Sequence, residues 1–455
     1  MEQIRLEGAT RPQSTAAPFC RPLLWAAAAS WPLAYLYTRG ILFHQGYAGW
    51  PLPAFALAFL AWVDLTARAL HRPAAGETPL WAGCWLALSA AMPLWGYQQG
   101  GLGDWQVIVW HLFAIWFVLA RCGMLAQGGT GGLVVLDALA GLFTLPWPHF
   151  ADRLRVVWQA LRAALARRSA KNRLAAGALT VLLTLAVFAL AWSQLSAADR
   201  HLAEISHWLT GWFRFTDYEL LNPLFWFLFS LPVGAWLFGL LSGCLRREQP
   251  PVTPAAFHAW LAPLRRLPRL TAHAVMGALC ALYGLFFALQ MVEWLSAGLS
   301  GLSAPHAAAF AVDGFWELFR ILLLNFAVLA AVRLLAPRAP SRGLTLLFCA
   351  FGPAFALMAG AKLAVYAALY GLTPRRVLAG WFLCVLLVWS VLALVRQFRS
   401  IPAARIAVFT LAVSFTVLSC VNVDQRVIDF NLWQYEQGLV QRLDTEVLRA
   451  CGWQG

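Results

Sequence analysis

The ionisable and aromatic polar residues in the last third of the chain stand out because they interrupt long apolar stretches. The candidate ligand-binding set consists of Asp313, Glu317, Arg320, Lys362, Tyr366, Tyr370, Arg375, Arg376, Asn422, Asp424 and Arg426. An ionisable group in lipid is costly, and it marks a functional site by default. The basic members could bind a phosphate or a carboxylate, and the acidic members could hold or relay protons.

The first part of this set begins an apolar stretch. Asp313, Glu317 and Arg320 are spaced by four and three residues, so they share one face of a helix. We interpret them as a polar pathway or ligand site. The alternative is an ion pair between Glu317 and Arg320 that only locks helices together.

A lysine inside the next apolar stretch forms the second part. Tyr366 and Tyr370 follow Lys362 along the same helix face. A lysine in lipid needs a carboxylate, a carbonyl or water, and Asp313, Glu317 and Glu293 are the candidate partners. If Lys362 is buried, its pKa should fall and it could transfer protons. The alternative is that its amine reaches the membrane surface.

Two further polar segments complete the set. Gly371 and Pro374 predict a tight turn, and Thr373 can cap a helix that starts at Pro374. Arg375 and Arg376 follow directly, and we expect them to bind an anion or to pair with the acidic tail. The segment 421–431 leaves the last apolar stretch and is dense in polar residues. For this segment, a ligand site and an ordinary exit from the bilayer remain equal alternatives.

The composition determines the class of protein. The chain has 455 residues, of which 61% are hydrophobic and only 12% are charged, about half the charged share of a soluble protein. Period-two alternation is absent, which argues against a membrane barrel. We predict an all-α polytopic transmembrane helix bundle of about eleven spans. These lie near 22–38, 45–63, 79–96, 105–121, 174–193, 219–243, 271–293, 314–335, 344–365, 377–396 and 402–420.

The basic residues orient the bundle. With a cytoplasmic N-terminus, the loops on the inner side hold 20 of the 34 Lys and Arg residues and the outer segments hold 8. We therefore expect a bacterial inner-membrane protein whose N-terminus is cytoplasmic and whose C-terminus is extracytoplasmic. Because the basic residues lie in short loops, the net charge of +14 indicates membrane lipid as a partner and not nucleic acid.

Several segments are expected to lie on the membrane surface. The stretch 132–147 is apolar but short and contains Asp137, so we predict a re-entrant or interfacial helix, with a true span as the alternative. Amphipathic surface helices are expected at 151–173, which is basic, and at 194–218. The predicted divisions are a four-span segment, 1–130; the surface helices, 131–173; a seven-span domain, 174–435; and a polar tail, 436–455.

No motif points to a cofactor or a metal ion. The nine cysteines form no C-x-x-C pair. His201 and His207 flank Glu204 but are six residues apart, which places them on different helix faces. The glycines of 128–132 lack the Lys-Ser/Thr of a P-loop, and we interpret them as a flexible turn. We therefore expect no cofactor, and the absence of hydrolase signatures leans against an enzyme.

Three segments together resemble a known family. They are Asp313-Gly-Phe-Trp-Glu-Leu, Tyr370-Gly-Leu-Thr-Pro-Arg-Arg and Val421-Asn-Val-Asp through Asn431. In this order they resemble an uncharacterised family of bacterial polytopic membrane proteins that carries a domain of unknown function. The resemblance covers about 175–435, departs from the family pattern at Val423, where proline is common, and implies fold and location without an activity.

These observations lead to three hypotheses about function. The leading one is an integral membrane protein that binds, translocates or senses a small or lipid-linked anionic ligand through an extracytoplasmic polar site. The second is a membrane-embedded transferase that acts on a lipid-linked substrate, with Asp313 or Glu317 as base. The third is a structural or accessory subunit whose polar groups only fix helix packing.

Overall fold

The computed structural model describes residues 20–42, 49–167, 184, 188, 217–300, 315–440 and 442–454. These residues form helices and, within the described ranges, no strand, so the predicted all-α class is confirmed. The chain divides into two compact units. Unit 1 comprises residues 1–39, 62–71 and 145–248, and unit 2 comprises residues 40–61, 72–144 and 249–455.

Unit 1 is built on two packed helices that a third helix contacts. α1 (Arg21–Tyr37) packs against α9 (Asp217–Arg246), and α6 (Asp152–Arg167) contacts both. The end of α2 (Pro51–Ala69) also belongs to this unit, and its Trp62 Nε1 donates to the Ala26 carbonyl at 3.0 Å. Small residues allow close packing on α9. A Cβ on Gly243 would lie 2.6 Å from the Leu145 carbonyl oxygen, so only glycine fits there.

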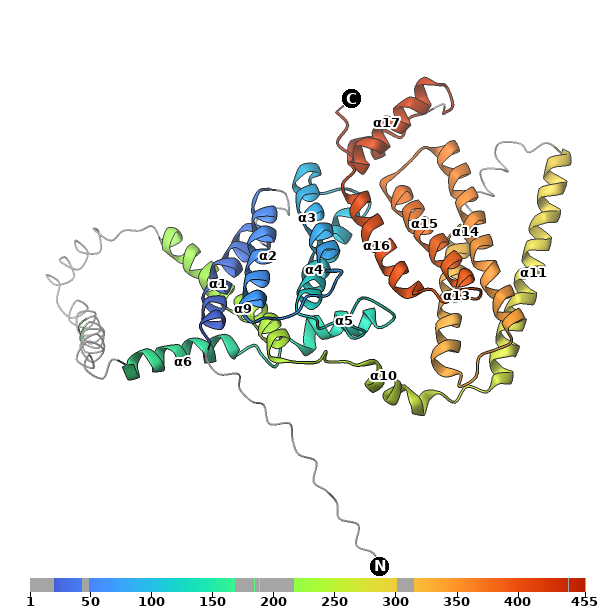
Figure 1. Cartoon of the computed structure of the whole chain (residues 1–455). Coiled ribbons are helices and arrows are strands. Elements are labelled where there is room, and N and C mark those ends of the chain that lie inside the picture. Colours follow the sequence, from blue (N-terminus) through green and yellow to red (C-terminus); the bar gives the residue numbers. More distant parts are fainter. Residues whose placement is uncertain are drawn as a thin grey trace, which may run out of the picture. The chain divides into compact units, whose positions relative to one another are not determined.

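Unit 2 contains the remaining helices (Figure 1). They are α3 (Thr78–Trp95), α4 (Leu102–Arg121), α5 (Val134–Leu139), the π-helical turn η2 (Ala140–Thr144), α10 (Pro254–Leu261), the 3₁₀ turn η3 (Ala262–Leu264), α11 (Arg269–Ser300), α13 (Phe315–Leu335), α14 (Arg342–Tyr370), α15 (Pro374–Val395), α16 (Ala403–Ser419), α17 (Val423–Glu436) and α18 (Thr445–Ala450). A further π-helical turn, η1 (Thr38–Leu42), lies where the two units meet in the sequence.

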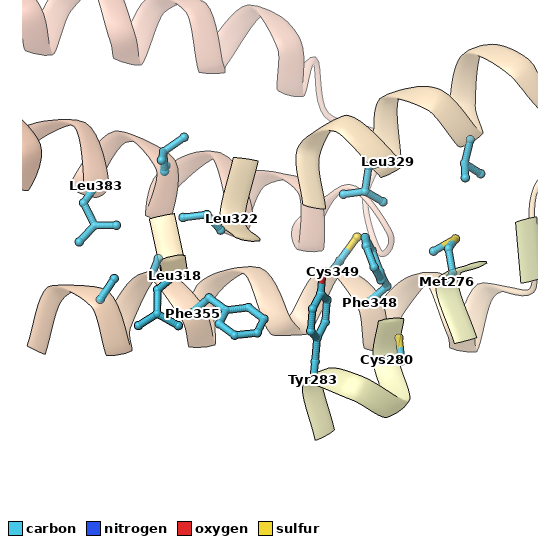
Figure 2. Packing of buried hydrophobic residues seen from close by; sticks show 14 of the residues in the cluster. Met276, Cys280, Tyr283, Leu318, Leu322, Leu329, Phe348, Cys349, Phe355 and Leu383 are labelled. Atoms are coloured by element: carbon cyan, nitrogen blue, oxygen red, sulfur yellow. The ribbon is translucent and has the colours of Figure 1, made fainter. Parts of the chain in front are cut away.

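The core of unit 2 lies among α11, α13, α14 and α15. Figure 2 shows Tyr283, Phe348 and Phe355 among the buried side chains there. The centres of the Tyr283 and Phe355 rings are 4.9 Å apart. One polar pair is buried with them, because Tyr283 Oη donates to Asn325 Oδ1 at 2.7 Å. α14 and α15 approach closely where Gly352 faces Ser390.

The number of spans differs from the prediction. Seven described helices are long and apolar enough to cross a bilayer: 51–69, 102–121, 224–246, 269–292, 315–335, 342–370 and 374–395. α16 and α17 meet at a bend of 68° and add an eighth if they form one span. α1 and α3 are present where spans were expected but do not reach this combination of length and hydropathy. The segment 174–193 lies outside the described residues, apart from two positions, so eleven spans are not confirmed.

The predicted surface segments have different outcomes. Within 132–147, α5 and η2 together form an apolar helix over Val134–Thr144, about half the length needed to cross a bilayer. Within 151–173, α6 exposes Leu154, Val157, Trp158 and Leu161, which recur at the spacing of one helix face. The surface helix predicted at 194–218 lies almost wholly outside the described residues.

Candidate functional site

The turn between α14 and α15 has the capped geometry that the sequence predicts. Gly371 has φ +74°, a conformation that favours glycine. The Thr373 side chain accepts a hydrogen bond from the Arg376 backbone N–H and caps α15, which begins at Pro374. The Arg376 guanidinium lies 4.1 Å from the centre of the Tyr366 ring and donates to the Tyr370 carbonyl at 3.1 Å. Arg376 is therefore held by the turn, whereas the Arg375 side chain is exposed.

Buried amide side chains of helix α17 form hydrogen bonds with the backbone of this turn and of the end of α14. Asn431 Oδ1 accepts from the Leu372 N–H at 2.7 Å, and Asn431 Nδ2 donates to the Leu372 carbonyl at 2.8 Å. One turn further on, Gln434 Nε2 donates to the Ala368 carbonyl at 3.2 Å. These bonds satisfy backbone groups that the end of α14 would otherwise leave without partners. The position of α17 against the turn is thus specified by side chains and not only by apolar packing.

The loop between α3 and α4 contacts the same two segments. Gln98 Oε1 accepts from the Val423 N–H at 2.9 Å, and Asp424 accepts from the Gln99 N–H at 3.0 Å. Gly100 lies against the start of α15, because a Cβ there would be 2.7 Å from the Arg375 backbone nitrogen. Residues 97–101, the α14–α15 turn (residues 366–376) and α17 thus form one structure, which we call the α17 site.

The structure brings most of the predicted site residues to this place. Tyr366, Tyr370, Arg375 and Arg376 come from the turn, and Asn422, Asp424 and Arg426 come from the start of α17. Their roles differ. Asn422 caps α17 by accepting from the Gln425 N–H, and Asp424 is occupied by Gln99. Arg426 is 75% exposed in its side chain and makes a long ion pair of 3.9 Å with Asp429.

The other predicted residues are not seen to join the α17 site. Glu317 and Arg320 form an exposed pair with each other at 4.0 Å, as their spacing predicts. Asp313 lies outside the described residues. Lys362 is buried with 7% of its surface exposed. It lies on α14 two turns before Tyr370, which is about 12 Å along the helix.

An apolar groove opens beside the α17 site. Its volume is ≈ 700 Å³. It lies among α15, α16, α17 and the turns before α15 and before α17, and its lining residues are Leu372, Val377, Trp381, Thr410, Val413, Ser414, Val417, Leu418, Val421, Val423 and Arg426. Among the described lining residues, Arg426 alone carries a charge. The groove is therefore apolar along its length and has one cationic group, Arg426, on the side formed by α17.

Sequence reasoning missed two parts of this site. It named the polar residues of 421–431 but did not anticipate that Asn431 would bind the turn backbone. It also overlooked Gln98 and Gln99, although a Gln-Gln-Gly-Gly run at the end of an apolar stretch is an unusual polar sequence. The sequence did not indicate the groove, because most of its lining residues are ordinary apolar residues on separate helices.

The fold and this site define a multi-pass helical membrane protein. The chain belongs to the family described as a domain of unknown function (DUF4153), whose model matches residues 82–452. The expected resemblance to a family with a domain of unknown function is thereby confirmed. The matched range includes the whole α17 site. No curated protein and no solved structure matches the chain.

Proposed function

We propose that this protein binds an anionic lipid-linked ligand at the α17 site, as a step in its translocation or sensing. The observation that carries this proposal is the apolar groove with Arg426 in its lining and the arginine-bearing turn beside it. The hydrocarbon chain of the ligand would lie in the groove, and its phosphate or carboxylate would bind the arginines. The distribution of basic residues among the loops supports an extracytoplasmic position for the site.

The groove has the dimensions and chemistry of a ligand site. Pockets for small ligands typically measure about 300–1,000 Å³ and are mostly apolar with a few polar groups, and this groove measures ≈ 700 Å³. The two hydroxyl side chains in its lining, Thr410 and Ser414, both donate to carbonyls of their own helix. The groove therefore presents an apolar surface along α15 and α16 and charge only from α17.

The arginines are available to an anion. The pair between Arg426 and Asp429 is long and exposed, and an exposed pair of this kind contributes little free energy. A phosphate could therefore replace Asp429 as the partner of Arg426. Arg375 is exposed at the start of α15, where the backbone N–H groups of a helix also favour negative charge.

The geometry favours binding over group transfer. A transferase needs a carboxylate or another base beside the reacting group. Among the described residues that line the groove there is no carboxylate. Asp424 accepts from Gln99, and Asp429 accepts from Gln425 Nε2 at 2.8 Å. The groove also favours ligand binding over the hypothesis of a structural or accessory subunit, because a subunit whose polar groups only fix helix packing needs no open site.

The test is native mass spectrometry of the protein in nanodiscs that contain anionic and zwitterionic lipids. We expect wild type to retain an anionic lipid, and we expect the double variant Arg375→Ala, Arg426→Ala to lose it about tenfold or more, the equivalent of one charge-assisted contact. Arg399→Ala is the matched control, because Arg399 is an exposed arginine in the α15–α16 loop.

A second variant tests the groove separately. Val413→Trp should fill it and displace the same lipid, whereas Val388→Trp, at a similarly exposed position of α15 outside the groove, should not. Unchanged lipid retention in both the arginine and the tryptophan variants would overturn the proposal. Loss in the arginine variant alone would show that the arginines bind the lipid headgroup while its chain does not lie in the groove, and it would overturn the role proposed for the groove.

A further inference from the structure

Two buried carboxylates lie in unit 2 near the glycine loop, residues 122–133, which joins α4 to α5. Glu77, at the start of α3, has a fully engaged carboxylate. It accepts from Trp81 Nε1 at 3.1 Å and from the Thr130 N–H at 2.9 Å, and Arg405 of α16 lies 3.1 Å away. The Thr130 hydroxyl also donates to it. Glu77 therefore fastens the glycine loop to α3 and α16.

Asp137 of α5 is placed differently. Only 3% of its surface is exposed. Its Oδ1 accepts from the Ala126 N–H of the glycine loop at 2.8 Å, but its buried Oδ2 has no hydrogen-bond partner among the described residues. A buried carboxylate that is ionised and lacks partners for one oxygen is strongly disfavoured. A proton on Oδ2 would remove the charge and leave the bond to Ala126 intact.

The surroundings of Asp137 reinforce this conclusion. Burial raises the pKa of Asp137 to about 6, and the negative charge of Glu77 acts in the same direction, while the Ala126 N–H opposes both. Among the described residues, no basic side chain forms an ion pair with Asp137, and Arg405 binds Glu77 instead.

We propose that Asp137 is a proton-binding site whose Oδ2 takes up and releases a proton and thereby controls the packing of the glycine loop. Uptake adds one proton from water to the carboxylate and involves no other bond. In the neutral form Asp137 holds Ala126 without a net charge. In the ionised form the bond to Ala126 is charge-assisted, but burial of the charge and its repulsion from Glu77 outweigh this gain, so states in which residues 122–133 open and expose Asp137 to water are favoured. This site is separate from the α17 site and does not depend on the proposed ligand.

The direct test is an infrared pH titration of the full-length protein in nanodiscs. The carboxylic-acid C=O absorption should gain a component as the pH falls, with a midpoint near pH 6, and this pH 6 band should be missing in Asp137→Asn. Asp152→Asn in unit 1 is the control, because the pKa of Asp152 lies below its ordinary value, and it should leave the band in place. A band that persists in Asp137→Asn, or a wild-type midpoint near pH 4, would refute the proposal.

A second readout reports the consequence for the loop. Asparagine resembles the neutral acid, so at pH 7.5 backbone hydrogen exchange across 122–133 should be slower in Asp137→Asn than in wild type. If Asp137 is instead an ionised structural acceptor, the substitution should speed exchange. Linkage adds a further expectation: relative to Asp137→Asn, the folding equilibrium constant of wild type should rise about tenfold from pH 7.5 to pH 5.

Discussion

At the scale of single residues, the α17 site depends on side chains that bond to backbone. Asn431 has both a donor and an acceptor engaged with Leu372, a pairing that requires an amide side chain. Gly371 precedes Leu372 and has the backbone conformation that lets the turn present these groups. The chemistry of the turn thus depends on one amide and one glycine acting together.

This dependence predicts different costs for two glycine substitutions. Gly371→Ala would place a Cβ 2.6 Å from Asn431 Oδ1, whereas Gly438→Ala, at a similar φ of +69°, meets nothing within 4 Å. Gly438→Ala should lose about 1–2 kcal/mol from its positive φ. Gly371→Ala should lose about 1–3 kcal/mol from its backbone, because its ψ of 178° combines with the positive φ in a region that essentially only glycine adopts. Gly371→Ala should lose about 1–3 kcal/mol more, because the Asn431 bonds are disrupted. Thermal unfolding in detergent measures the difference, and equal costs would show that Asn431 simply moves aside.

At the scale of elements, one buried carboxylate attaches the amphipathic helix α6 of unit 1 to α9. Asp152, at the start of α6, is 1% exposed. Its neighbours are His149 at 2.8 Å, Ser242 at 2.8 Å and Arg246 at 3.1 Å, the last two from α9. Arg155 of α6 also donates to Asp152 at 3.2 Å. Five residues therefore share the network, and α6 is anchored at one end while its apolar face stays exposed.

The network predicts how pH affects α6. Burial alone would raise the pKa of Asp152, but hydrogen bonds from His149 and Ser242 and the charge of Arg246 together lower it. A lowered pKa means that Asp152 stabilises the fold fully above its ordinary value of 3.8 and that this contribution is lost as the pH falls below it. The protection of the α6 amides from hydrogen exchange, corrected for the intrinsic pH dependence of exchange, should therefore fall as the pH drops below 3.8.

A substitution checks the same network at neutral pH. Asp152→Asn should reproduce the faster exchange of α6 at pH 7 and cost about 1–3 kcal/mol, because His149, Ser242 and Arg246 would lose an acceptor. Asp104→Asn is a suitable comparison, since Asp104 pairs with Tyr97 in an exposed position. Exchange in α6 that does not respond to Asp152→Asn would mean that apolar packing on α1 and α9 anchors the helix.

At the scale of the whole molecule, the number of spans and the sidedness decide how the two candidate sites relate to the membrane. α16 is 17 residues long and turns by 68° into α17. Its start lies beside the Glu77 cluster, and its end leads into the α17 site, both within unit 2. If α16 crosses the bilayer, the proposed proton site and the proposed ligand site lie on opposite sides of the membrane.

Cysteine labelling can measure this arrangement. In a cysteine-free background, Arg399→Cys and Glu436→Cys should react with a membrane-impermeant reagent from opposite sides, with Glu436→Cys accessible from outside. The expectation rests on the asymmetry of basic residues and on the exposure of both positions. Labelling of both from the same side would show that α16 and α17 do not complete a span.

Much of the fold could be predicted from local sequence. Helix α15 begins at Pro374 with Thr373 as its cap, as the turn motif indicates, because capping involves only neighbouring residues. The pair between Glu317 and Arg320 follows from spacing in the same way. The number of spans could not be predicted in the same way. α1, α3 and α16 are of intermediate length and hydropathy, and sequence alone does not determine whether such a helix crosses the bilayer.

By itself, the sequence determined that this is an all-α membrane protein with polar residues concentrated in its last third, because hydropathy and helical spacing are local properties. Only the tertiary structure decided which of these residues meet. It joined Gln98 and Gln99 to α17, formed the groove from three helices, and placed Asp137 and Glu77 at the glycine loop that the sequence marked only as a turn. Residues that meet in the fold can be far apart in the sequence, as are Glu77 and Arg405, which lie 328 positions apart. Packing between helices brings such residues together, and no local pattern encodes that packing.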